Sequence, residues 1–333
     1  MNKFTFTYPT KVYYGEGIAS EALRQELPKA GKTVMLAYGG GSLKKSGVYD
    51  ELKSLLAQAG KEVVDFSGIM PNPTYAKVQE GAKLAKERHV DFILAAGGGS
   101  VIDCCKVISV QAMTEEDIWN MEYQSGKFPA AGIPMGAVVT ASGAFDTLSH
   151  AMETYLGNSD ADNVSDDVAL AVMRNTVVNM RRLLENINDM QARGNLMWDS
   201  AMAENGILKV GRLTDFQAHQ IEHQLGAYTD CSHGQGLAVI HPVYYRHILK
   251  DAPEKFARFA KEVFEKDTAG EGVEALASFI KECGLPTRMN QLKSKVEITP
   301  DVLRQVADTC NIIKCNPREL NREEIYEILC ECL

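Results

Sequence analysis

Short apolar runs separated by amphipathic segments occupy the first part of the chain. Four runs have the length and composition of buried strands, at 33–38, 62–66, 90–96 and 133–140. Apolar residues recur at helical spacing in one segment before these runs, at 21–27, and in three segments between them, at 48–59, 75–88 and 101–110. This order of elements predicts a parallel sheet with helices on both faces. Partial alternation over 4–14 predicts a further strand or hairpin arm.

Beyond about residue 140, strand patterns become rare and helical periodicity dominates. Helices are predicted at 146–155, 166–185, 193–205, 215–225, 254–264, 272–283, 300–309 and 322–332. We therefore predict two domains, an α/β domain over residues 1–140 and an all-α domain over residues 141–333.

The composition is that of a globular enzyme rather than a nucleic-acid-binding protein. The 333 residues carry a formal net charge of −9 and no long run of Lys and Arg, so no basic footprint for nucleic acid is visible. No apolar stretch reaches the roughly 18 residues that a membrane span needs. The N-terminus lacks the pattern of a signal peptide, and the eight cysteines include no zinc-finger pair. We expect a cytoplasmic protein with reduced thiols that does not enter membranes.

Glycine-rich turns follow two of the predicted strands. Gly97–Ser100 come after the run at 90–96, and Gly39–Ser42 come after the run at 33–38. A glycine turn between a strand and a helix lets a pyrophosphate approach the backbone, where the helix N-terminus offers unpaired N–H groups. Asp103 is predicted on the first turn of the helix at 101–110, which follows Gly97–Ser100. Simple tight turns are the alternative, since neither triplet has the GxGxxG pattern.

Histidines cluster in the second half, where six of the seven fall between His150 and His247. Asp146 and His150 are four residues apart, as are His219 and His223, so each pair shares one helix face. His233 follows in SHGQG, where the glycines predict a sharp turn toward the preceding helix. One carboxylate with several imidazoles suits Fe²⁺ or Zn²⁺. Ordinary surface pairs are the alternative, and spacing alone does not show which histidine is not a ligand.

Several segments resemble the iron-containing alcohol dehydrogenases, and most closely their butanol dehydrogenase-like, NAD(P)H-dependent members. The matching segments are PTKVYYGEG, GGGSLKKSGVYD, MPNPT, GGGSVIDCCK, GAFDTLSHAMETY and HQIEHQLGAYTDCSHGQGLAVIHP. The resemblance implies a dinucleotide-binding α/β domain followed by a helical metal-binding domain. It also implies a homodimer acting on a small-molecule substrate.

The resemblance assigns roles to individual residues. It implies metal ligation by Asp146, His150, His219 and His233, and places His223 as a further active-site histidine near the nicotinamide. The pyrophosphate turn matches Gly97, Gly98, Gly99, Ser100 and Asp103, and the segment beside the adenosine ribose matches Gly40, Gly41 and Ser42. That segment lacks an acidic residue and carries Lys44 and Lys45, which favours NADP over NAD.

The implied activity is the interconversion of a small primary alcohol and its aldehyde by hydride transfer with NAD(P). A divalent metal, Fe²⁺ or Zn²⁺, would act as the Lewis acid. The chain departs from the family after Thr140, where several tens of residues are missing from the cofactor domain, so its parallel sheet is expected to be shortened. Two alternatives follow: a catalytically impaired metal-binding relic, or a glycerol dehydrogenase-like enzyme on the same scaffold.

Overall fold

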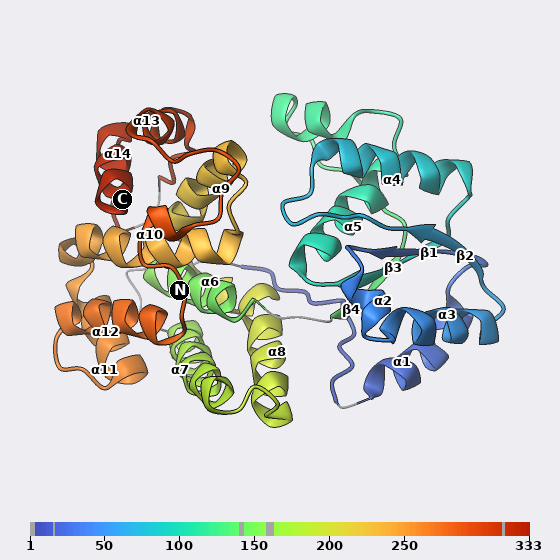
Figure 1. Cartoon of the computed structure of the whole chain (residues 1–333), viewed down its shortest axis with the longest axis horizontal. Coiled ribbons are helices and arrows are strands. Elements are labelled where there is room, and N and C mark those ends of the chain that lie inside the picture. Colours follow the sequence, from blue (N-terminus) through green and yellow to red (C-terminus); the bar gives the residue numbers. More distant parts are fainter. Residues whose placement is uncertain (1–3, 16, 140–142, 158–162, 315–316) are drawn as a thin grey trace. The chain divides into compact units, whose positions relative to one another are not determined.

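The computed structural model describes residues 4–15, 17–139, 143–157, 163–314 and 317–333. The chain divides into two compact units: residues 11–142 form one, and residues 143–333 with the first ten residues form the other. The domain boundary predicted at residue 140 lies outside the described residues. Figure 1 shows strands confined to the first unit and helices throughout the second.

Parallel strands form the centre of the α/β unit. They are β1 (Thr33–Tyr38), β2 (Glu62–Phe66), β3 (Phe92–Gly97) and β4 (Met135–Val139), in the order β2-β1-β3-β4. All three pairings are parallel. The chain runs outward from β1 to β2 and then crosses back to β3, so the strand order reverses between β1 and β3. Ligands of open α/β sheets bind at the carboxyl ends of the strands beside such a reversal.

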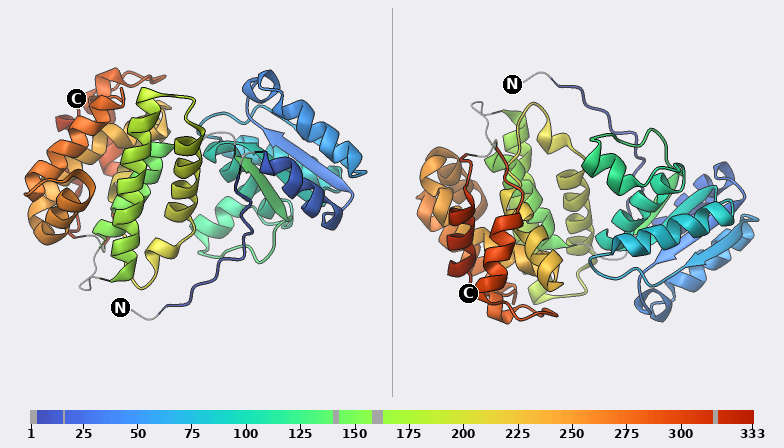
Figure 2. Two further views of the ribbon diagram at one scale, coloured as in Figure 1. Left: turned by 90° about the horizontal axis from the view of Figure 1, so that it is seen from below. Right: turned by 90° about the horizontal axis from the view of Figure 1, so that it is seen from above.

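Helices cover both faces of this sheet, as the views in Figure 2 show. They are α1 (Ile18–Glu26), α2 (Ser42–Lys45), α3 (Val48–Gln58), α4 (Tyr75–Glu87) and α5 (Gly99–Gln111). Apolar residues of α4 and α5 form one core cluster with the sheet. Those of α1 and α3 form another core cluster with the alternate strand positions. The central strands β1 and β3 bury both faces, as expected of a parallel sheet between two helical layers, whereas the edge strands β2 and β4 are partly exposed.

The predicted strand over residues 4–14 is wrong, because these residues have no regular secondary structure. A strand is stabilised by ladder hydrogen bonds to a neighbour, and no strand pairs with this segment in the described part of the chain. Phe4 and Tyr14 remain more than half exposed.

In the part of the second unit that the structure describes, helices are the only regular secondary structure, and they enclose one large apolar core. Its helices are α6 (Ala144–Leu156), α7 (Val164–Glu185), α8 (Met190–Glu204), α9 (Gln217–Thr229), α10 (His233–Ile248), α11 (Pro253–Phe264), α12 (Ala269–Glu282), α13 (Pro300–Thr309) and α14 (Arg322–Glu331). The predicted fold class, an α/β unit with a shortened parallel sheet plus an all-α unit, is confirmed. None of the described helices is long and apolar enough to cross a bilayer.

Helix α10 replaces the sharp turn predicted around Gln235. It begins at His233 and continues through Pro242. A Cβ at Gly236 would lie 2.7 Å from Oε1 of Glu222, so glycine at this position allows α9 and α10 to approach closely. Gly236 therefore serves helix packing rather than a reversal of the chain.

Candidate functional site

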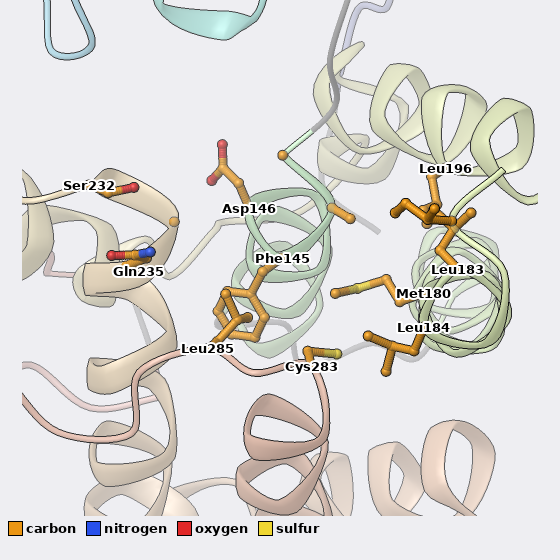
Figure 3. A pocket seen from close by; sticks show the side chains of 14 residues that line it. Phe145, Asp146, Met180, Leu183, Leu184, Leu196, Ser232, Gln235, Cys283 and Leu285 are labelled. Atoms are coloured by element: carbon orange, nitrogen blue, oxygen red, sulfur yellow. The ribbon is translucent and has the colours of Figure 1, made fainter. Parts of the chain in front are cut away.

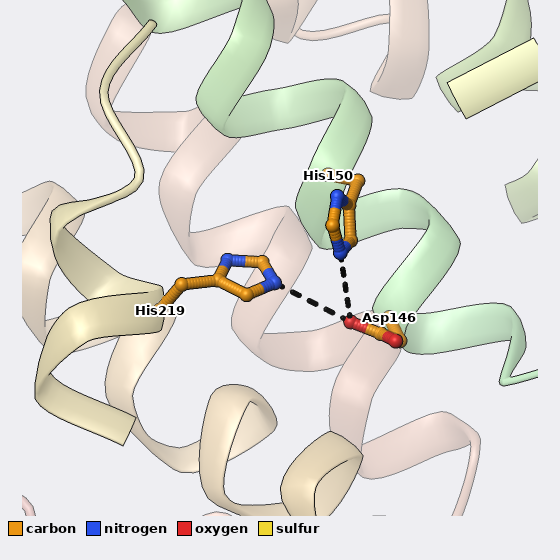
Figure 4. Close-up of side chains that lie close together, drawn as sticks. All are labelled: Asp146, His150 and His219. Atoms are coloured by element: carbon orange, nitrogen blue, oxygen red, sulfur yellow. Dashed lines mark ion pairs between the residues drawn. The ribbon is translucent and has the colours of Figure 1, made fainter. Parts of the chain in front are cut away.

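Four predicted ligand side chains meet at one point within the helical unit. Helix α6 supplies Asp146 and His150 one turn apart, α9 supplies His219, and His233 is the first residue of α10. The Nε2 atoms of these histidines lie 3.6, 3.5 and 3.4 Å respectively from Oδ1 of Asp146. Figure 4 shows His150 and His219 converging on this oxygen from separate helices. The chain thus directs three imidazole nitrogens toward a single carboxylate oxygen.

Buried glutamates hold the opposite ring nitrogens of two of these histidines. Nδ1 of His219 is hydrogen-bonded to Oε2 of Glu153, and Nδ1 of His233 to Oε2 of Glu222. Glu153 is fully buried and also accepts a hydrogen bond of 2.7 Å from the backbone N–H of Ala218. A hydrogen bond at Nδ1 fixes the ring orientation and leaves Nε2 available as a ligand.

The donor set fits a divalent transition metal. Oδ1 of Asp146 and Nε2 of His219 are buried and make no hydrogen bond, although buried polar atoms normally have a partner. One carboxylate oxygen and three imidazole nitrogens are the ligand types that Fe²⁺ and Zn²⁺ accept. A cation among these atoms would satisfy both unpaired atoms at once.

Opposing charges perturb the titration of the site. Burial lowers the pKa of His219, but the charge of Glu153 and contact with Asp146 outweigh it and raise that pKa to about 9. His233 behaves alike: burial lowers its pKa, while Asp146 and Glu222 together raise it to about 10. Burial and the neighbouring His219 lower the pKa of His150 to about 3. Burial raises the pKa of Asp146, but its contacts with His219 and His233 outweigh burial and lower that pKa.

Phe216 lies beside the candidate ligands in an unfavourable backbone conformation. It precedes α9 with a φ of 56°, a region that costs a residue with a side chain about 1–3 kcal/mol. Its ring centre lies 5.3 Å from that of His150 and 5.1 Å from that of His219. The strained backbone therefore places an aromatic ring against both imidazoles.

His223 lies next to the four side chains without sharing their common oxygen. Its ring centre is 5.8 Å from that of His219 and 5.3 Å from that of His233, and the residue is exposed. Desolvation by the surrounding protein and the charges of His233 and His219 lower its pKa to about 4. The imidazole therefore faces solvent at the edge of the candidate centre.

The two glycine turns lie at adjacent strand ends in the α/β unit. Tyr38 at the end of β1 pairs with Ala96 near the end of β3. A Cβ at Gly40, Gly41 or Gly99 would meet nothing within 4 Å, so internal packing does not explain these glycines. Open space above the backbone is what a closely approaching ligand requires.

The remaining predicted cofactor residues surround these turns. Gly97 ends β3, Gly98 is the N-cap of α5 without a side-chain cap, and Ser100 lies in its first turn. Asp103 is exposed and its Oδ1 accepts a hydrogen bond of 2.8 Å from Nζ of Lys106. After β1, Ser42 begins α2, and Nζ of Lys44 lies 4.8 Å from the ring centre of Tyr49.

An apolar cavity of about 330 Å³ adjoins Asp146 within the helical unit. In Figure 3 the side chains of Phe145, Met180 and Leu184 gather on one side of Asp146, with Ser232 on the other. Cavities lined mainly by apolar side chains with a few polar groups are typical of small-molecule sites.

Family models match both units of this chain. The model described as "Iron-containing alcohol dehydrogenase" matches residues 9–160, and "Fe-containing alcohol dehydrogenase family, C-terminal" matches residues 140–333. The chain belongs to the iron-containing alcohol dehydrogenase family. The resemblance stated from the sequence is confirmed.

Relatives align over nearly the whole chain. NADH-dependent butanol dehydrogenase A of Clostridium acetobutylicum is 30% identical over 389 positions, covering 98% of this chain and 99% of the relative. The NADPH-dependent aldehyde reductase YqhD of Escherichia coli is 26% identical, covering 92% of this chain and 94% of the relative. The crystal structure of NADH-dependent butanol dehydrogenase A from Thermotoga maritima has a TM-score of 0.92 at 28% identity. The match covers 100% of this chain and 99% of that chain.

The alignment to the Clostridium enzyme also shows how much shorter this chain is. It spans 389 positions, whereas this chain has 333 residues, so the relative has several tens of residues without a counterpart here. This difference is consistent with the internal deletion expected from the sequence.

Proposed function

We propose that this chain interconverts a small primary alcohol and its aldehyde by hydride transfer with NAD(P). The proposed metal ligands are Asp146, His150, His219 and His233. The observation that carries the proposal is the convergence of three Nε2 atoms within 3.4–3.6 Å of Oδ1 of Asp146. Membership of an oxidoreductase family whose relatives include NADH- and NADPH-dependent enzymes supports the reaction type.

A bound Fe²⁺ or Zn²⁺ supplies Lewis acidity toward an alcohol or aldehyde oxygen. The chain's own residues prepare for this chemistry. Glu153 and Glu222 orient the rings of His219 and His233, and their negative charge makes those imidazoles better electron donors. His223 is proposed to exchange the alcohol proton with solvent at a ring nitrogen, because it is the exposed imidazole beside the ligands.

The cofactor is proposed to bind at the glycine turns of the α/β unit. The N–H groups at the start of α5 follow Gly98 and suit a pyrophosphate, with Ser100 in the same turn. Gly40, Gly41 and Ser42 are proposed to lie beside the ribose. Lys44 and Lys45 favour a 2′-phosphate, so we propose NADP as the preferred cofactor and NAD as the alternative.

The cavity beside Asp146 supports an aliphatic substrate. Its walls are mainly apolar, and it lies next to a proposed ligand. An alkyl chain of a few carbon atoms would lose its contact with water there, which favours butanol-sized compounds over polyols such as glycerol. This preference separates the proposal from a glycerol dehydrogenase-like activity.

The test combines metal analysis with a steady-state assay. Protein loaded with Fe²⁺ or Zn²⁺ is expected to hold about one ion per chain and to oxidise NADPH with butyraldehyde. Glycerol with NADP or NAD serves as the substrate control. Metal binding without NAD(P)H binding, measured by cofactor fluorescence, would instead identify a metal-binding relic whose shortened α/β unit no longer serves catalysis.

A further inference from the structure

A second carboxylate reaches the candidate metal centre from helix α8. Glu204 is the last residue of that helix, and its Oε1 lies 3.1 Å from Nε2 of His150. This is the same nitrogen that faces Oδ1 of Asp146 at 3.6 Å. Glu204 therefore contacts a proposed ligand at its metal-binding atom, unlike Glu153 and Glu222, which contact Nδ1 atoms.

A metal on His150 would change the surroundings of Glu204. Nε2 has one lone pair, so it cannot bind a cation and also donate a hydrogen bond to Glu204. Binding a cation there leaves the carboxylate close to a new divalent charge. The Glu204 side chain is 47% exposed and ends its helix, so it can turn toward the cation without disturbing the core.

The donor set makes the cation the better partner for this carboxylate. With Asp146 and three imidazoles alone, the site has the four ligands of a tetrahedral zinc centre. A further carboxylate oxygen raises the coordination number, which suits Fe²⁺ and Mn²⁺ better than Zn²⁺. The unpaired atoms of Asp146 and His219 point to a cation independently of Glu204.

We propose that Glu204 is a fifth protein ligand of the candidate metal centre. The inference rests on the proposed metal centre of Asp146, His150, His219 and His233. In this arrangement Glu204 shields the cation from water when no substrate is bound and biases the site toward Fe²⁺ and Mn²⁺. When an alcohol binds, its oxygen would replace the Glu204 carboxylate: one metal–oxygen bond would break as another forms, with no electron transfer.

The test measures metal affinity and coordination in full-length Glu204→Gln protein. We expect the Kd for Mn²⁺ to rise about tenfold while the Kd for Zn²⁺ changes less than about threefold. With Co²⁺ as a spectroscopic probe, loss of the fifth ligand is expected to strengthen the visible absorption, because four-coordinate Co²⁺ absorbs more strongly. Glu204→Asp, which retains a shorter carboxylate, is expected to recover part of the Mn²⁺ affinity.

Glu185→Gln is the matched control, because Glu185 is also an exposed residue that ends a helix of this unit. If Glu204→Gln binds Mn²⁺ and Zn²⁺ as tightly as the unaltered protein does and its Co²⁺ spectrum is unchanged, the role of Glu204 alone is overturned. Failure of the unaltered protein to bind any of the three ions would instead overturn the metal centre itself. Circular dichroism verifies that each variant is folded.

Discussion

The fully buried carboxylate of Glu153 accepts a hydrogen bond from Nδ1 of His219, although the two residues lie 66 positions apart on different helices. This contact determines that Nε2, and not Nδ1, faces Asp146. Glu222 holds His233 in the same way. The candidate centre therefore depends on carboxylates that do not touch the common oxygen.

Replacing Glu153 with Gln is expected to weaken metal binding while preserving the fold. The amide oxygen can still accept from Nδ1, but the negative charge that strengthens the imidazole is lost. Removing such a contact typically lowers metal affinity about 10- to 100-fold. Titration with Zn²⁺ against a competing chelator measures the change, and an unaltered Kd would show that the charge of Glu153 is irrelevant to the ion.

His219 and His223 are expected to respond differently to replacement with Ala. His219→Ala removes a nitrogen that lies 3.5 Å from Asp146, so most bound metal should be lost. His223→Ala should retain the metal and lower turnover, because its ring lies beside the centre. Elemental analysis and a butyraldehyde assay distinguish the two variants. Loss of metal in His223→Ala would mean that His223 is itself a ligand.

Two glycines of the same turn offer a comparison between packing and binding. A Cβ at Gly97 would lie 2.6 Å from Cγ2 of Val101, so Gly97→Ala is expected to destabilise the protein by about 1–3 kcal/mol. Gly99→Ala meets no neighbouring atom and should fold normally while raising the KM for cofactor. Urea unfolding and cofactor kinetics measure both effects, and normal cofactor binding by Gly99→Ala would argue against a pyrophosphate at this turn.

Lys44 and Lys45 test the cofactor preference. Their joint replacement with Ala should raise the KM for NADPH about tenfold or more, because charge-assisted hydrogen bonds contribute about 1.5–3 kcal/mol. The KM for NADH should change little, since it lacks the 2′-phosphate. Equal changes for both cofactors would show that the lysines do not discriminate between them.

Buried thiols predict a loss of stability at alkaline pH. Burial raises the pKa of Cys104 to about 11 and that of Cys105 to about 12. The folded chain therefore keeps protons that the unfolded chain releases above its ordinary thiol pKa near 8.5. The free energy of unfolding should fall as pH rises above about 8.5.

Urea midpoints at pH 7.5 and pH 10 measure this effect. A thiol reagent should also react slowly with these cysteines in the folded protein and quickly in urea. Rapid labelling of Cys104 and Cys105 in the folded state would contradict their burial.

Local patterns predicted most of the helices and strands. The predicted strands at 33–38 and 62–66 match β1 and β2, because a short apolar run bounded by turn residues is enough to indicate a buried strand. Helix α10 was missed because Gly234, Gly236 and Pro242 are poor helix formers, and burial against other helices overrides that preference. The strand prediction for residues 4–14 was wrong for the opposite reason, because a strand needs a neighbouring strand that its own sequence does not contain.

The sequence placed the candidate ligands but missed the residues that orient them. Glu153 and Glu222 each lie three residues after a candidate histidine on the same helix, a spacing that was available as a signal. Their partners, however, are on other helices, and such contacts are not visible from spacing. Glu204 was missed for the same reason, since it reaches His150 from α8.

All four proposed metal ligands belong to the helical unit, and the glycine turns belong to the α/β unit. A protein of this fold that loses residues from its α/β unit would therefore keep all four proposed metal ligands. A bound cation would also cross-link α6, α9 and α10, so a chelator should lower the melting temperature of this half even in proteins that no longer turn over substrate.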